Sequence, residues 1–590
     1  MLTAPPAESA AVRRTSEDRY KWIALFNCTL GVLMATLDSS IVLIAMPDIF
    51  RGIHLDPLDP GNSSYLLWMI LGFLIITSVL VVNFGRLGDL YGRVRLYNLG
   101  FVVYTTFSLF LAVTWMSGSA GALWLVVMRV FQGVGAALLI AQSPAILTDA
   151  FPEHQRGLAL GIQNIAGIAG VFIGLVLGGL LAPIDWRLIF FISVPIGVFG
   201  TVWAYWKLEE RGVRRSAPID WTGNLTFAAG LVLLMVGITY GIEPSGHSQT
   251  GWTSVPVLTE LASGIGFLAA FLVIENHVAE PMFRLALFRI RAFSAGTLST
   301  LLAGIARGGL MFILIIWLQG IWLPRHGYSF SQTPLWAGIY MLPLTAGFLL
   351  AGPVSGALSD RFGARPFATG GMILSALSYV LMMFLPVNFP YPLFALLLFM
   401  NGIAMGTFAS PNRAGVMNSL PAQHRGAGGG MNSTFQNAAQ VLSIGIFFSL
   451  LIVGLAATLP TSLSHGLVAA GVPRSQAAHL ANLPPVSVLF AAFLGVNPIT
   501  HLLGSGAISH LPNASMLTSR SFFPTLIAAP FKNGLREAFT FSAIACLVAA
   551  WASWLRGGRY VFAEEREPDQ SDTREVSASS GVAAPVEIGA

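Results

Sequence analysis

The stretch that decides the fold is Gly85-Arg86-Leu87-Gly88-Asp89-Leu90-Tyr91-Gly92-Arg93-Val94-Arg95, because the chain contains it twice in outline. The second copy, in the other half of the chain, is Gly356-Ala357-Leu358-Ser359-Asp360-Arg361-Phe362-Gly363-Ala364-Arg365. Both share Gly-x-Leu-x-Asp-x-x-Gly with an arginine close behind, and both lie between long apolar runs. We interpret each as a short turn between two membrane helices. A duplicated turn of this kind is typical of a transporter built from two related helical bundles.

Composition supports a membrane protein. Of the 590 residues, 55% are hydrophobic and only 10% are charged, and the mean hydropathy is +0.71, whereas a soluble domain carries about 25% charged residues. Apolar runs of about 20 residues, each long enough to cross the hydrocarbon layer, recur along the chain. We therefore expect an all-α polytopic membrane protein. The net charge of +5 then belongs to its loops and gives no reason to expect a nucleic-acid partner.

The apolar runs predict fourteen transmembrane helices. A second repeated pair, residues 152–157 and 421–426, is separated along the chain by nearly the same distance as the two turns. The matching separations indicate two six-helix bundles related by a pseudo-two-fold, with two helices inserted centrally between them. The expected spans are 22–47, 64–84, 96–116, 121–148, 158–182, 188–207, 222–241, 255–275, 293–320, 335–357, 367–386, 392–411, 429–456 and 535–555.

Charge predicts the orientation. With the N-terminus inside, 23 Lys and Arg residues fall in cytoplasmic segments and 7 outside, so both termini are expected in the cytoplasm of a multi-pass cell-membrane protein. We expect flexible cytoplasmic tails at 1–20 and 557–590, an N-terminal bundle at 21–207, a linker with the two inserted helices at 208–291, a C-terminal bundle at 292–456 and 535–556, and an extracytoplasmic loop at 457–534.

The long loop contains one apolar run, 484–495, that is short for a span. A crossing here would also place the C-terminal arginines outside. We expect one or two short helices lying on the outer surface, with a plain flexible insertion as the alternative.

Four further motifs stand beside the turn from Gly85 to Arg95. They are Leu37-Asp38-Ser39-Ser40 through Pro47 in the first span, Arg129-Val130-Phe131-Gln132-Gly133 in the fourth span, the glycines Gly170, Gly174, Gly178 and Gly179 in the fifth, and Trp186-Arg187 through Pro195 before the sixth. Together with the turn, they resemble the fourteen-helix drug:proton antiporter branch of the major facilitator superfamily. The chain departs from that branch at Gly174-Leu175, where the fifth-helix antiporter motif normally has Gly-Pro, and this leaves the coupling direction open.

Three charged residues lie deep in the expected spans: Asp38, Arg129 and Arg307. At about 1.5 Å of rise per residue, all three fall in the middle to outer half of the membrane. Each would cost about 2.5–3.5 kcal/mol or more if it faced lipid unpaired. We therefore expect them to face a wet cavity or one another.

Our hypothesis is that Asp38 carries a coupled proton, because a low-dielectric cavity favours the neutral acid and a nearby arginine favours the charged form. The alternative is a permanent Asp–Arg pair that fixes helix packing. Arg129 either gates the proton path or ties helices together. Arg307 could bind an anionic group of the substrate, pair with Asp38 or line the cavity between the bundles.

The signature turn predicts a latch that holds the two halves closed on the cytoplasmic face in one conformation and releases in the other. Gly85 and Gly92 permit a sharp reversal, Asp89 can cap a helix, and Arg93 can pair with Asp149 or Glu153. Plain surface charges that obey the topology rule are the alternative for the arginines. In the second half, Asp360 with Arg361 or Arg365 is the expected counterpart.

Polar residues in other spans are candidates for the substrate cavity, although each is also explained as an interhelical hydrogen bond. The motif glycines at spacing four are expected to serve close helix packing. Cys28 and Cys546 lie in spans and predict no disulfide. The cavity candidates are Gln132, Gln142, Gln163, Asn164, Gln319, Tyr340, Asn401, Gln436 and Asn437.

Three function classes are consistent with these features. The first is a proton-coupled exporter of hydrophobic or cationic drugs, or of related amphipathic compounds, working by alternating access. The second is a same-fold exporter of an endogenous lipid or metabolite, or a facilitator with other coupling. The third is a membrane sensor or enzyme. Since the sequence has no phosphate-binding loop, zinc-ligand spacing or nucleophile elbow, we expect no enzyme, cofactor or metal. The expected partners are a small amphipathic substrate, protons and lipid, and we expect a monomer.

Overall fold

The fold is helical throughout the part of the chain that the structure describes. A computed structural model describes residues 7–59, 61–212, 220–243, 245, 250–278, 281, 283–421, 425–509, 511 and 513–557. Every element in these ranges is a helix. Fourteen of the described helices are long and apolar enough to cross a membrane, and each overlaps one expected span. The predicted fourteen-helix fold is confirmed.

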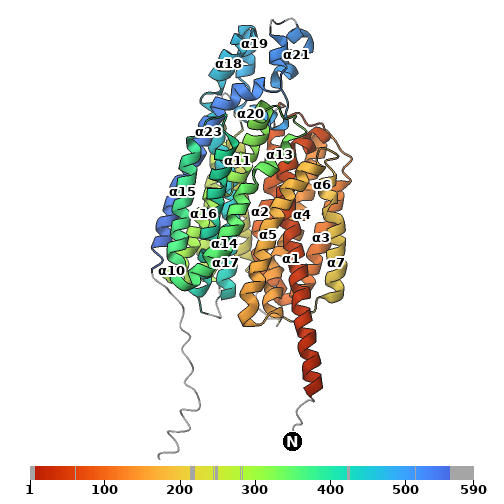
Figure 1. The fold of residues 1–590 in the computed structure, drawn as a ribbon, viewed down its shortest axis with the longest axis vertical. Coiled ribbons are helices and arrows are strands. Elements are labelled where there is room, and N and C mark those ends of the chain that lie inside the picture. The colour runs from red at the N-terminus through yellow and green to blue at the C-terminus, as the bar shows by residue number, and fades with distance from the viewer. Residues whose placement is uncertain are drawn as a thin grey trace, which may run out of the picture.

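The first bundle contains six spans and begins with α1, the longest of the described helices (Figure 1). Its last span is made of two short helices in sequence. Buried aromatic residues such as Tyr97, Phe101 and Tyr104 fill its interior. The elements are α1 (Ala7–Gly52), α2 (Asn62–Tyr91), α3 (Arg93–Ala112), α4 (Gly118–Ala150), α5 (Glu153–Leu181), α6 (Leu188–Phe191) and α7 (Ser193–Lys207).

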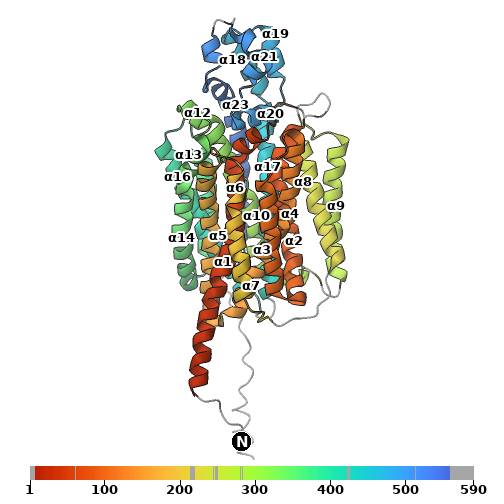
Figure 2. The same cartoon turned by 90° about the vertical axis from the view of Figure 1, so that its right-hand side faces the viewer.

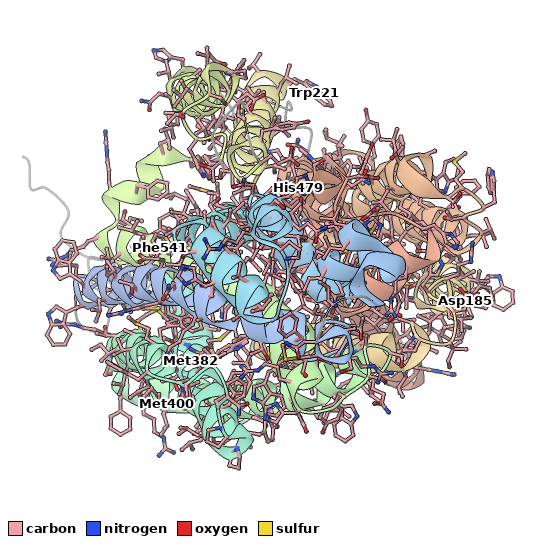
Figure 3. All side chains as sticks on the ribbon, turned by 90° about the horizontal axis from the view of Figure 1, so that it is seen from above. Asp185, Trp221, Met382, Met400, His479 and Phe541 are labelled. Carbon is pink, nitrogen blue, oxygen red and sulfur yellow. The ribbon has the colours of Figure 1, made fainter. Side chains whose placement is uncertain are left out.

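The two inserted helices, α8 (Trp221–Gly241) and α9 (Val255–His277), pack against each other. Helix α8 also packs against α2 of the first bundle and α17 (Arg425–Ala456) of the second. The pair therefore stands at the seam between the bundles, on one side of the molecule (Figure 2). Viewed from above, the helix that carries Trp221 lies beside the bundles and not between them (Figure 3).

The second bundle contains the other six spans (Figure 1). Its first span is interrupted by a two-residue turn after α10 and continues through a π-helical segment. Besides α17, the elements are η1 (Leu285–Arg289), α10 (Arg291–Arg307), α11 (Leu310–Ile316), η2 (Trp317–Trp322), α12 (Leu323–Arg325), α13 (Thr333–Tyr340), α14 (Leu342–Phe362), α15 (Ala364–Met383), α16 (Tyr391–Asn418) and α23 (Phe522–Trp554).

The last span, α23, begins at Phe522, well before the expected position 535. The polar residues that made this segment look like a loop, Asn533 and Arg536, lie on the exposed side of the helix. Between them Gly534 and Leu535 are buried. The segment is therefore an amphipathic extension of the membrane helix.

Five short helices between α17 and α23 form a cap, defined here as residues 459–517. The cap lies at the end of the bundles opposite the start of α1 (Figures 1 and 2). We call that end the cap end, and the end where α1 begins and α23 finishes the terminal end. The cap elements are α18 (Leu459–Ala469), α19 (Arg474–Ala481), α20 (Pro485–Leu494), α21 (Pro498–Ser509) and α22 (Ala514–Leu517).

Close packing within the first bundle depends on glycine at the contacts between helices. A Cβ added to Gly135 of α4 would lie 2.5 Å from the backbone nitrogen of Tyr104 on α3. A Cβ added to Gly161 of α5 would meet nothing within 4 Å. The contact between α3 and α4 therefore requires glycine at position 135, whereas no contact requires it at position 161.

We predict that Gly135→Ala lowers the free energy of unfolding by about 1–3 kcal/mol, because α3 and α4 must separate to admit the methyl group. The matched change Gly161→Ala should leave stability unchanged or raise it slightly, since alanine is the better helix former. Thermal unfolding of the purified protein in detergent measures both. Equal stability of the two variants would show that the α3–α4 contact does not limit packing.

Candidate functional site

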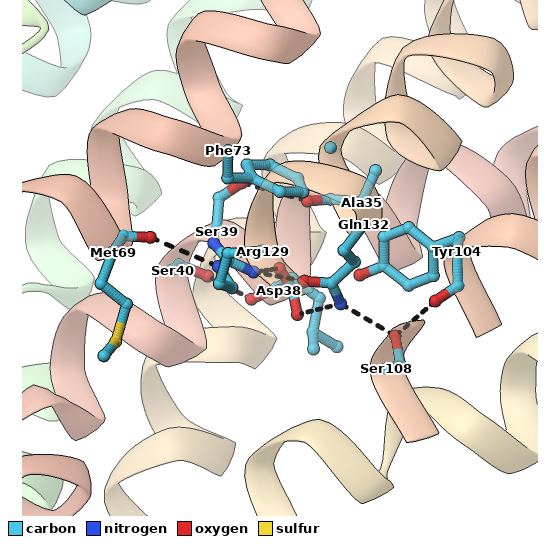
Figure 4. Close-up of polar contacts among 12 residues, drawn as sticks. Ala35, Asp38, Ser39, Ser40, Met69, Phe73, Tyr104, Ser108, Arg129 and Gln132 are labelled. Carbon is cyan, nitrogen blue, oxygen red and sulfur yellow. Dashed lines mark hydrogen bonds and ion pairs between the residues drawn. The ribbon is translucent and has the colours of Figure 1, made fainter. Parts of the chain in front are cut away.

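A buried ion pair joins α1 and α4 in the middle of the first bundle (Figure 4). Arg129 Nη1 donates to Asp38 Oδ2, and the side chains of Asp38 and Arg129 are 0% and 2% exposed. The two charges expected from sequence at similar depth are thus in direct contact. Arg307, the third, lies elsewhere.

Neutral groups complete the hydrogen bonding of the pair. Gln132 Nε2 donates to Asp38 Oδ1 at 3.1 Å and to Ser108 Oγ at 2.8 Å. Arg129 Nη1 also donates to Gln132 Oε1 at 2.7 Å, and its Nε donates to the Met69 carbonyl oxygen at 3.4 Å. The pair is therefore embedded in a connected polar network, which lowers the penalty of burying two charges.

An aromatic ring lies against the cation. The Arg129 Cζ lies 4.3 Å from the centroid of the Phe73 ring, a distance at which the face of the ring attracts a cation. Phe73 lies on α2, so the arginine is held by three helices of one bundle, α1, α2 and α4. Phe73 and Ser108 were not among the residues expected at this site, because neither carries a charge or a motif.

The glycines of the fifth-span motif position the helix that carries Asp38. A Cβ on Gly170 would lie 2.7 Å from the Leu33 carbonyl oxygen, and one on Gly178 would lie 2.9 Å from the Ile41 carbonyl oxygen. Gly174 faces the same helix at Leu37. Helix α5 therefore packs directly on the backbone of α1 along the turns that flank the carboxylate.

The fourth motif glycine, Gly179, has another role. It faces the backbone of Leu335 on α13, and Leu175 presents its carbonyl oxygen to Gly338 of the same helix. These contacts join α5 of the first bundle to the second bundle at the cap end. Leu175, which replaces the motif proline, is fully buried in this seam.

The signature turn forms ion pairs at the terminal end. Arg93 Nη1 donates to Asp149 Oδ1 at 2.7 Å, and Arg93 Nη2 donates to Asp89 Oδ1 at 2.7 Å. Gly92 has a φ of 112°, a value that favours glycine. Gly85 is not required for packing, because a Cβ added there would meet nothing within 4 Å. Both acids paired with Arg93 belong to the first bundle, so these pairs do not form the expected latch between the two halves.

A residue that sequence reasoning missed completes the turn. Glu210, just past α7, accepts hydrogen bonds from the backbone nitrogens of Arg93 and Val94, at 2.9 Å and 3.1 Å. A carboxylate at the start of α3 satisfies free N–H groups and interacts favourably with the helix dipole. Glu210 is 117 residues from Arg93 in the sequence, so no local motif indicated this contact.

The second turn differs from the first. The side chain of Asp360 lies outside the described residues, and Arg361 is exposed. Arg365 stacks on Trp554, with Cζ 3.8 Å from the ring centroid. Nearby, Arg556 donates to Asn412 Oδ1, and burial lowers the pKa of Arg556 to about 10.

Arg307 does not reach Asp38. Its electrostatic neighbours are Tyr379 on α15 and Cys546 on α23, both within the second bundle. Neither an ion pair nor a hydrogen bond to a described residue holds its guanidinium. The expected pairing of Arg307 with Asp38 is therefore not found.

The other polar candidates are scattered. Gln319 is buried and its Nε2 donates to the Ile44 carbonyl oxygen at 3.1 Å, a link between the bundles. The Tyr340 hydroxyl lies 2.9 Å from the Tyr328 hydroxyl. The remaining candidates do not share one site: Gln142 bonds to Phe84, Asn401 bonds to Ser378, Gln163 is buried with Nε2 unpartnered among the described residues, Asn437 is half-buried, and Asn164 and Gln436 are exposed.

Helix α20 lies between the bundles at the cap end. All ten of its residues are buried, and it packs against α1 and α2 of the first bundle and against η2 and α17 of the second. Its Phe490 stacks on Phe448 of α17 at 5.2 Å between ring centroids. The sequence placed this segment on the outer surface, but a helix that is apolar on every side is stable only when buried.

Comparison with known proteins agrees with this architecture. A family model described as Major Facilitator Superfamily matches residues 28–444. A solved bacterial homolog to the human lysosomal transporter Spinster, inward-facing and unoccupied, aligns with a TM-score of 0.53 and 14% identity over 92% of this chain and 99% of that chain. A likeness at this identity shows the fold alone.

Curated relatives are similar over most of their length. The riboflavin transporter RibZ of Clostridioides difficile is 29% identical over 73% of this chain and 88% of that protein. The tetracenomycin C resistance and export protein of Streptomyces glaucescens is 26% identical over 93% of both chains. The methyl viologen resistance protein SmvA of Salmonella typhimurium is 28% identical over 79% of this chain and 90% of that protein.

We predict that Asp38→Asn lowers the free energy of unfolding by about 3–5 kcal/mol, because it leaves the Arg129 charge buried without its counter-charge. Arg129→Gln in the Asp38→Asn background should recover much of that loss. Asp48→Asn, which removes the partner of the half-exposed Arg51 on the same helix, should cost less than about 1 kcal/mol. Thermal unfolding of these three variants and of Arg129→Gln alone tests this, and additive losses at 38 and 129 would contradict it.

Proposed function

The chain belongs to the major facilitator superfamily, and from this membership we propose that it is a proton-coupled exporter of hydrophobic or cationic amphipathic compounds, monomeric in the cell membrane. That it is a multi-pass transport protein follows from the family and the fold. The observation that carries the coupling proposal is the fully buried carboxylate of Asp38 in contact with Arg129.

The network around Asp38 supports two protonation states. When the carboxylate is charged, Arg129 and Gln132 both donate to it. When it is neutral, Arg129 still has the Gln132 Oε1, the Met69 carbonyl and the Phe73 ring as partners. Proton binding therefore leaves Arg129 with neutral partners in place of its counter-charge, and the free energy this costs is what a change between the two conformations must offset.

The positive-inside rule supports placing the terminal end in the cytoplasm and the cap outside. In this arrangement the buried contacts of α20 and the Gln319–Ile44 link close the outer side between the bundles. Substrate release to the outside then requires that this seam opens. Alternating access by rocking of the two bundles provides such an opening.

The cap moves with the second bundle in this mechanism, because it is inserted between α17 and α23, which both belong to that bundle. Outward opening then breaks the packing of α20 on α1 and α2. It also breaks a second link, since His501 Nε2 of the cap lies 2.9 Å from Asp56 Oδ2 in the loop after α1.

The names of the relatives support export. The tetracenomycin C protein and SmvA are named for resistance or export. RibZ, named as a riboflavin transporter, favours the second candidate, a carrier of an endogenous metabolite with other coupling. Leu175 in place of the motif proline favours the same alternative.

We predict that Asp38→Asn abolishes proton-driven transport in proteoliposomes. An imposed pH gradient should drive uptake of a fluorescent cation by the wild-type protein. The uptake rate of the variant should be at least about tenfold lower, because its residue 38 no longer exchanges a proton. Substrate exchange without a gradient should persist, and this separates lost coupling from lost folding.

The matched control is Asp48→Asn, further along the same helix, which should retain gradient-driven uptake. Wild-type pH dependence in Asp38→Asn would refute the carrier role. Gradient-independent uptake by the wild-type protein would favour the facilitator.

We also predict that a short bis-maleimide cross-link between Asp56→Cys and His501→Cys blocks transport, because it ties the cap to the first bundle. A cross-link between Phe448→Cys and Phe490→Cys, which ties α20 to its own bundle, should leave at least half of the transport rate. The proteoliposome assay before and after cross-linking measures both. Full activity of the first cross-linked pair would show that the cap need not leave the first bundle.

A further inference from the structure

The cap contacts the first bundle through a group whose charge depends on pH. The cap contains no aspartate or glutamate, so its bases have no acidic partner within it. His501 Nε2 of α21 lies 2.9 Å from Asp56 Oδ2, in the loop between α1 and α2. We call this contact the cap link. It adds a titratable contact to the packing of α20 on the same two helices, which is almost wholly apolar.

The acid of the cap link is held in place by its own bundle. The backbone nitrogen of Leu58 donates to Asp56 Oδ1 at 2.9 Å, and Asn62 Nδ2 donates to the Asp56 carbonyl oxygen at 2.8 Å. Oδ1 is thus occupied within the first bundle, and Oδ2 is the oxygen that meets the cap. The first bundle therefore presents a fixed acceptor to His501.

The cap link is open to the medium. The side chains of His501 and Asp56 are 49% and 25% exposed, whereas that of Asp38 is 0% exposed. In the proposed orientation, the medium at this end is the outer one. Imidazole is the side chain whose charge ordinarily changes between pH 5 and 8. External pH therefore acts on the cap link directly, without passing through Asp38.

Other charged groups surround the cap link without sharing it. Helix α21 packs against α19 and α22, and α22 carries no titratable residue. Among the described residues, Asp56 is the one that forms an ion pair with His501. The remaining charged or titratable groups near the link are Arg474 and His479 on α19, and Arg51, His54 and Asp59 close to Asp56 in the sequence.

We propose that the cap link is a pH-sensitive brake on outward opening; this rests on the proposed function, in which the cap leaves the first bundle. A protonated His501 donates a charge-assisted hydrogen bond to Asp56, which is stronger than the bond from neutral imidazole. The docked cap then holds this proton more tightly than the separated cap. By linkage, acid outside favours docking, and a rise in pH weakens it. Because the pair is partly exposed, we expect a change of about two- to fivefold in the docking equilibrium.

A distance measurement between the cap and the first bundle tests the brake. Spin labels at Ser119→Cys, where α4 begins at the cap end, and at Ser475→Cys on α19 report this distance by double electron–electron resonance in nanodiscs. Both serines are exposed, and the two native cysteines are buried. The ratio of docked to separated cap should rise on acidification from about pH 8.5 to about pH 5.5. This rise should be about two- to fivefold larger in the labelled parent than in His501→Gln. Titration of Asp38 is common to both proteins and cancels.

Asp56→Asn should reduce the rise as His501→Gln does, and about 1 M salt should reduce it by screening. The matched control is His479→Gln, which removes an exposed histidine from α19 of the cap (Figure 3) and should keep the full rise. An equal rise in His501→Gln and its parent would overturn the brake while leaving the opening of the cap intact. A single distance at every pH would overturn the opening itself, and the brake with it.

Discussion

The low dielectric of the membrane makes an unpaired charge within it costly, and the first bundle is organised around one buried ion pair. In the first bundle, the partners are Asp38 and Arg129, which lie on α1 and α4 and are sealed from solvent. A pair of this kind is stable only if its geometry is fixed, because its attraction must offset the desolvation of two ions. The glycine ladder of α5 fixes one side of it by packing on the α1 backbone.

The two bundles share a neutral hydrogen bond at corresponding positions but carry different charged residues beside it. Gln132–Ser108 and Asn401–Ser378 show that duplication preserved the neutral hydrogen bonds. It did not preserve the charges, because Arg307 stands at the place of Asp38 and no arginine follows on α16 at the equivalent position. The first bundle therefore holds a buried ion pair, and the second holds a single guanidinium at the corresponding position along the chain.

Sequence patterns predicted what depends on composition and on distance along a helix. The fourteen spans follow from apolar length. Depth along the spans indicated only that Asp38, Arg129 and Arg307 would face a wet cavity or one another, and the structure pairs the first two. Depth along a helix does not say which way a side chain points around it. The sequence therefore could not show that the neighbours of Arg307 are on α15 and α23 and do not include Asp38. Glu210 was missed because its partners are backbone nitrogens far away in sequence.

The position of α20 links the cap to transport through packing alone. The sequence showed an apolar run too short to span, and a surface location was the simple interpretation. Ten buried residues that touch both bundles cannot stay in place when those bundles separate at the cap end. Because the cap is covalently continuous with the second bundle, the contacts that must break are those with α1 and α2. Helix α1, which carries Asp38, is one of the surfaces that α20 would leave, so in the proposed mechanism protonation and outer opening both act on α1.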